Sequence, residues 1–166
     1  MNDDLVVLLF QAVHRVEEHI RAEEYLAVLA VEGQRSLILS DYDYLLDRAA
    51  AEAFERRAAV HARRVSAVRW VLAVPQVWVI SKHDVAVRSA SPHPLREGEQ
   101  EAITWVACDH VEGVDYGRVA YARRPRGEPV FEEPEVFTVP LLPGELMPGH
   151  TLLRILTSDD DEPASD

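Results

Sequence analysis

The segment that decides the fold is VRWVLAVPQVWVI, residues 68–80. It is dense in β-branched residues and carries two tryptophans, a composition typical of a strand in a packed sheet. Pro75 interrupts the run and has no N–H to donate to a strand ladder. We therefore expect two stretches, 68–74 and 77–80, that meet at a bulge or at a sheet edge. The alternative is that the preceding helix continues to Leu72.

Further strands are predicted on the C-terminal side of this segment. A turn at 82–84 leads into 85–88 and completes a hairpin. Residues 89–100 contain two prolines and a glycine among charged residues, which predicts a loop and the clearest internal boundary. The remaining apolar runs predict strands at 102–109, 118–122, 136–139 and 152–156.

Two amphipathic helices are predicted on the N-terminal side. Apolar residues recur every three or four positions over 4–20, and Asp3 or Asp4 is the expected N-cap. A second stripe over 41–64 predicts another helix with an arginine-rich outer face, capped by Ser40 or Asp41. Between them, 25–31 and 36–39 read as two strands around a turn at 32–35. Continuation of the first helix to Val31 remains the alternative.

This order of elements predicts an α+β fold. Two amphipathic helices from the N-terminal half pack on a mainly antiparallel sheet and cover one of its sides. Residues 1–157 form a single domain, and 158–166 form a disordered acidic tail.

The charge balance limits the classes of partner. The 166 residues hold 29 acidic and 17 basic side chains, a formal net charge of -12, which opposes general attraction to nucleic acid or anionic lipid. No stretch reaches the roughly 18 apolar residues of a membrane span. The single cysteine has no partner for an internal disulfide, and the sequence starts without a signal-peptide pattern. We expect a cytoplasmic protein that binds neither nucleic acid nor membrane.

Several strong catalytic signatures are missing from the sequence. It has no phosphate-binding loop, no dinucleotide fingerprint, no zinc-protease motif and no serine elbow. The best local cluster is Cys108-Asp109-His110, because a strand would place Cys108 and His110 on the same face, where an imidazolium lowers a thiol pKa. These three are the catalytic candidates. One Cys-x-His pair supplies only two of the four ligands of a closed zinc site, so no metal and no cofactor are expected.

Two other groups are candidates for binding. Arg123, Arg124 and Arg126 form a cationic loop suited to a carboxylate or a phosphate. The proline-rich segment 129–149 is expected to be extended and to run across another surface or along a sheet edge. Its candidate interaction residues are Phe131, Phe137, Leu141 and Leu142.

The sequence alone favours a non-enzymatic protein-interaction or accessory module. It would bind a protein partner or a second copy of itself, through a sheet face or through the proline-rich segment. The alternative is a small enzyme or ligand-binding protein with a pocket between helices and sheet near Cys108 and His110.

Overall fold

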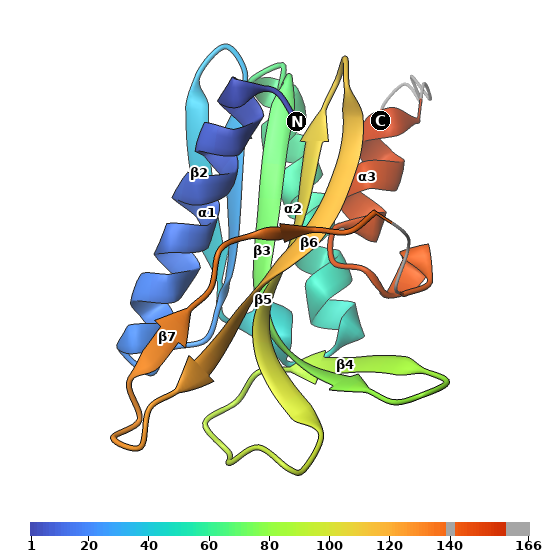
Figure 1. The fold of residues 1–166 in the computed structure, drawn as a ribbon. Helices are drawn as coiled ribbons and strands as arrows, with labels where there is room; N and C mark the ends of the chain where they lie inside the picture. The colour runs from blue at the N-terminus through green and yellow to red at the C-terminus, as the bar shows by residue number, and fades with distance from the viewer. Residues whose placement is uncertain (139–141, 159–166) are drawn as a thin grey trace.

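The computed structural model describes residues 1–138 and 142–158, which form an α+β fold (Figure 1). Within that part of the chain an eight-stranded antiparallel sheet has the order β2-β1-β3-β5-β6-β7, while β4 pairs with β3 and β8 with β6. The strands are β1 (Ala27–Glu32), β2 (Ser36–Asp41), β3 (Arg69–Ile80), β4 (Val85–Ser89), β5 (Glu99–Asp109), β6 (Gly113–Arg123), β7 (Pro129–Phe131) and β8 (Glu135–Val136). The helices are α1 (Asp3–Arg21), α2 (Arg48–Arg64) and α3 (His150–Thr157), with short 3-10 turns η1 (Asp43–Leu45) and η2 (Gly144–Leu146).

The helices cover both faces of the sheet. Alternate residues of a strand point to opposite faces, and in β1 Val28 and Ala30 pack in the cluster under α1 whereas Leu29 and Val31 pack in the cluster under α2 and α3. The expectation of two helices on one side was therefore wrong. An amphipathic stripe shows that a helix has a buried face, but it does not show which side of the sheet that face meets.

Both predicted helices form, but other residues cap them. Asn2 caps α1, because its Oδ1 accepts the N–H of Leu5 at 2.8 Å. The second helix begins at Arg48, where the Asp47 side chain accepts the N–H of Ala50 at 2.7 Å. The start predicted near residue 41 was too early because Asp41 still pairs with β1 and a 3-10 turn follows it.

The hairpin near residue 30 is confirmed in preference to a longer first helix. β1 and β2 pair antiparallel from Ala27–Asp41 to Glu32–Ser36. The helix α1 ends at Arg21, and Glu23 adopts a left-handed backbone conformation (φ 60°) that an α-helix does not allow. β1 is buried from Ala27 to Val31, as expected for a strand covered on both faces.

Pro75 lies inside one continuous strand rather than between two. On one side β3 pairs with β5 along its length, with Pro75 opposite Ile103. On the other side the pairing with β1 ends at Ala73 and the pairing with β4 begins at Gln76. The proline thus stands at the junction between two partner strands, where its missing N–H breaks no regular ladder.

The last predicted strand, 152–156, is instead the helix α3. Leu152 is buried against α2 while Arg154 is exposed. Of the strand predicted at 136–139, only Val136 is in a strand (β8), and Val139 lies outside the described residues. The predicted acidic tail also lies outside them, apart from Ser158.

None of the helices in the described residues is both long and apolar enough to cross a membrane.

Candidate functional site

The outer strand β2 presents an open sheet edge. It stands at one end of the strand order and pairs with β1 on its inner side. In an antiparallel ladder every second residue directs its N–H and C=O away from the neighbouring strand. Five of its six residues, Ser36–Ser40 (SLILS), carry no charge and no proline, two of the features that usually protect an edge strand. This edge is therefore suited to pairing with another chain.

The other outer strands carry protection of this kind. β7 is three residues long and begins with Pro129. β8 is two residues long and follows Pro134. β4 contains Arg88, whose guanidinium bonds the Glu99 carboxylate. Among the described strands, β2 is thus the most suitable for strand addition.

The side chains on the two faces of β2 differ in burial. Leu37 and Leu39 are half-buried against the cluster under α2. Ile38 points to the opposite face and is 37% exposed. At the end of the strand, Asp41 Oδ2 accepts a hydrogen bond from Arg57 at 3.0 Å, and its Oδ1 accepts the N–H of Asp43 at 2.8 Å. The start of the strand is preceded by the exposed Arg35.

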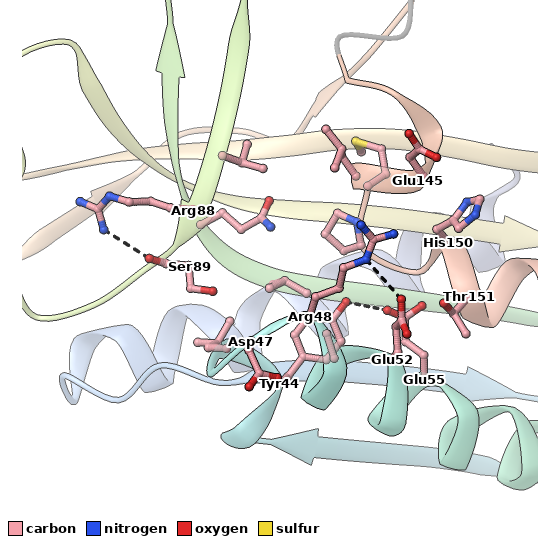
Figure 2. A pocket seen from close by; sticks show the side chains of 18 residues that line it. Tyr44, Asp47, Arg48, Glu52, Glu55, Arg88, Ser89, Glu145, His150 and Thr151 are labelled. Atoms are coloured by element: carbon pink, nitrogen blue, oxygen red, sulfur yellow. Dashed lines mark hydrogen bonds and ion pairs between the residues drawn. The ribbon is translucent and has the colours of Figure 1, made fainter.

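A cavity of about 290 Å³ lies between α2, the β3–β4 pair and the start of α3 (Figure 2). Figure 2 shows Tyr44 and Glu55 joined at its wall, with His150 on the side of α3. Tyr44 and Glu55 are both buried, and the Tyr44 hydroxyl donates to Glu55 Oε2 at 2.8 Å. Burial raises the pKa of both groups above their ordinary values.

Internal bonds occupy the Glu55 carboxylate. Its Oε1 accepts the N–H of Leu152, in the first turn of α3, at 3.0 Å. The N-cap of α3 is Gly149, which has no side chain to satisfy that donor. One further lining atom, Gln76 Oε1, is buried without a hydrogen-bond partner among the residues the structure describes. At this wall the Glu55 carboxylate thus holds the start of α3 in place.

Cys108 and His110 line a common hollow of about 560 Å³ beside Trp70 and α3. Burial, together with the charge of Asp109, raises the pKa of the Cys108 thiol to about 11, so the thiol is protonated at neutral pH. The imidazole Nδ1 of His110 bonds the backbone carbonyl of Val68 at 3.1 Å. The two side chains are thus brought to one hollow without the low thiol pKa that a nucleophile needs.

Asp109 lies at the end of the sheet and accepts hydrogen bonds from several segments. It is 2% exposed and accepts bonds from Asn2 Nδ2 at 3.0 Å, Arg69 Nε at 3.2 Å and the N–H of Val111 at 2.9 Å. These donors, with Asn2 the strongest contributor, hold the pKa of the carboxyl well below its usual range. Asp109 therefore ties the start of α1 to β3 and β5.

The structure places the three arginines of the predicted cationic loop differently. Arg123 Nε donates to Glu101 Oε2 at 3.0 Å, and its NH2 group donates to the Tyr25 hydroxyl at 2.7 Å. Arg124 and Arg126 are exposed in the turn that follows. Of these three side chains, Arg123 is thus used within the fold.

The described residues of the proline-rich segment, 129–138 and 142–149, pack against the rest of the chain. Phe131 lies against Tyr121, with ring centroids 5.0 Å apart, and Phe137 lies against Trp78 at 5.6 Å. Leu142 is buried in the cluster around Trp78, and Leu141 is outside the described residues. The aromatic side chains in this segment thus contact the sheet.

Within residues 1–138 and 142–158 no three His, Cys, Asp or Glu side chains are grouped to hold a metal ion. No protein-family model, curated protein or solved structure matches this chain. The open edge of β2 was not among the sequence candidates. The signal that points to it is the neutral run SLILS, but the edge position itself depends on the order of distant strands.

Proposed function

We propose that this chain is a non-enzymatic protein-binding module of the cytoplasm that accepts a strand of another polypeptide along β2. The observation that carries the proposal is the open edge over Ser36–Asp41, with outward backbone groups and no protecting charge, proline or bulge in its central residues. Main-chain hydrogen bonds would supply affinity, and alternate side chains of β2 would supply specificity.

The state of the ionisable side chains supports binding rather than catalysis. The Glu55 carboxylate holds α3, and Asp109 holds α1. The Cys108 thiol, with its pKa of about 11, lacks the activation that covalent catalysis requires. We therefore rank the enzyme or ligand-binding alternative at the Cys108–His110 hollow below protein binding.

A photoreactive amino acid at position 38 tests the proposal. Ile38 is 37% exposed on the edge strand, and Val7, which is 57% exposed on the outer surface of α1, provides the control position. In cells that produce the full chain, irradiation is expected to give a discrete protein adduct from position 38 but not from position 7. Mass spectrometry should map the attachment to an extended segment of the captured chain. No adduct at position 38, or equal capture from position 7, would overturn the proposal.

A further inference from the structure

The segment around β2 is nearly symmetric about its centre. Residues 35–41 read Arg-Ser-Leu-Ile-Leu-Ser-Asp, so Ser36 and Ser40, and likewise Leu37 and Leu39, are equidistant from Ile38. The two ends carry opposite charges. A two-fold axis through Ile38 would therefore place like residues opposite one another inside the strand and opposite charges at both ends.

From this symmetry we propose that the strand bound by β2 is β2 of a second copy of this chain, paired antiparallel with Ile38 opposite the partner's Ile38. The inference rests on the proposed function and names its partner. A two-fold interface is formed by the same surface on both copies, so each contact away from the axis occurs twice. Joining the two edges would continue both sheets through one shared ladder and satisfy the outward backbone groups of each β2.

The charges select this orientation and register. Arg35 would lie opposite the partner's Asp41, which already bonds Arg57, so each carboxylate would lie between two guanidinium groups. Parallel pairing in register would instead put Arg35 opposite Arg35 and Asp41 opposite Asp41, and like charges directly opposite one another are destabilising. A shift of one residue would place Leu37 or Leu39 opposite Ile38. The leucines of one copy would then no longer lie opposite the leucines of the other.

The side chains of β2 fit the same arrangement. On the α2 side, the half-buried Leu37 and Leu39 would meet the same residues of the partner and extend the cluster they already join. On the opposite face, the two copies of Ile38 would cover one another, and the exposed Ser36 would lie beside the partner's Ser40. A six-residue edge makes a small interface, so we expect a weak dimer whose population depends on concentration.

Cysteine cross-linking tests the register directly, because the chain has one native cysteine and a Cys108→Ala background is free of thiols. Directly opposite residues of paired strands have Cα separations that a disulfide can span. We expect Ile38→Cys to form covalent dimers under mild oxidation about tenfold faster than Val60→Cys, an exposed control on α2. Ser36→Cys and Ser40→Cys should each stay uncoupled alone and couple when mixed.

Each outcome of this experiment either supports or overturns the two-fold pairing of β2. Coupling of Ile38→Cys no faster than the control, or coupling of Ser36→Cys with itself, would overturn the two-fold register. Circular dichroism of each variant shows that the fold is retained, and a misfolded cysteine variant is replaced by wild-type chain carrying a photoreactive group at position 38. If the photoreactive group captures a different protein, self-pairing is wrong while strand addition at β2 stands; if it captures nothing, the proposed function fails as well.

Discussion

Glu55, in the middle of α2, caps the first turn of α3 by accepting the N–H of Leu152 at 3.0 Å. The same carboxylate accepts the Tyr44 hydroxyl at 2.8 Å. One buried side chain thus joins the 3-10 turn that precedes α2 to the last helix of the described chain. This link keeps α3 on the sheet face that α2 also covers.

Substitution of Glu55 by alanine should loosen α3. The change leaves a buried hydroxyl and a buried N–H without an acceptor, which costs about 3 kcal/mol of unfolding free energy. Urea denaturation measures the loss, and Glu52→Ala is the matched control because its ion pair with Arg48 is exposed on the same helix. An equal effect of the two substitutions would contradict the capping role.

The pH dependence of the Glu55→Gln variant should have a defined sign. Burial raises the folded-state pKa of Glu55 above 4.5, so the folded chain binds this proton more tightly than the unfolded chain does. That contribution to stability is fully present below pH 4.5 and is lost as pH rises through the folded pKa. As pH rises through this range, the unfolding free energy of the wild type should fall relative to that of Glu55→Gln. A difference between the two that does not change with pH would contradict the raised pKa.

Asp109→Asn should show the opposite pH behaviour. The folded-state pKa of Asp109 lies below the ordinary 3.8, so its contribution is present above pH 3.8 and is lost as pH falls through the folded pKa. At pH 7 we expect the variant to lose about 3 kcal/mol, because a charged acceptor of several bonds is removed. The deficit should shrink in acid. Thermal or urea unfolding at several pH values gives the comparison, and a deficit that persists unchanged below pH 3 would refute the explanation.

Gly117→Ala should destabilise the sheet where β6 passes Trp105. A Cβ at this position would collide with the Trp105 ring and with the backbone oxygen of Glu135. Overpacking of this kind costs about 1–3 kcal/mol. Gly144→Ala is the control, since nothing lies within 4 Å of its added Cβ, and its effect should stay below about 1 kcal/mol. Equal midpoints in urea for both variants would argue against the close contact.

The sequence predicted the parts of the fold that depend on local pattern. The valine-rich stretches predicted as strand at 68–74 and 77–80 form the single strand β3 (Arg69–Ile80), and the 3.6-residue stripe of 4–20 forms α1. The five-residue run 152–156 was misread because so short an apolar run does not separate a strand from a buried helix. Its helical state depends on α2 and on the Glu55 cap, which are distant in sequence.

The candidate site was less accessible to sequence reasoning. Cys108 and His110 do line one hollow, but the thiol pKa reflects burial and the charge of Asp109, which require coordinates. The exposure of β2 follows from the strand order, in which β1 and β3 are neighbours although α2 separates them along the chain. Neither property is encoded within a short window of residues.

The charge match across the edge predicts a selective effect of Arg35. Arg35→Gln and Gln34→Glu each make the chain more negative by one charge, and both positions are exposed in the same turn. Only Arg35→Gln removes the proposed contact with the partner's Asp41, so it should weaken dimerisation several-fold more than Gln34→Glu. Sedimentation equilibrium measures both dissociation constants. Equal weakening would mean that net charge, rather than the specific pair, governs association.

Amide hydrogen exchange along β2, followed as protein concentration is raised, tests the central claim most directly. Pairing predicts that alternate amides of Ser36–Asp41 become protected at high concentration and that Ile38→Lys abolishes this gain while the β1 amides stay protected. Exchange of the outward amides that stays fast at every concentration would contradict the account.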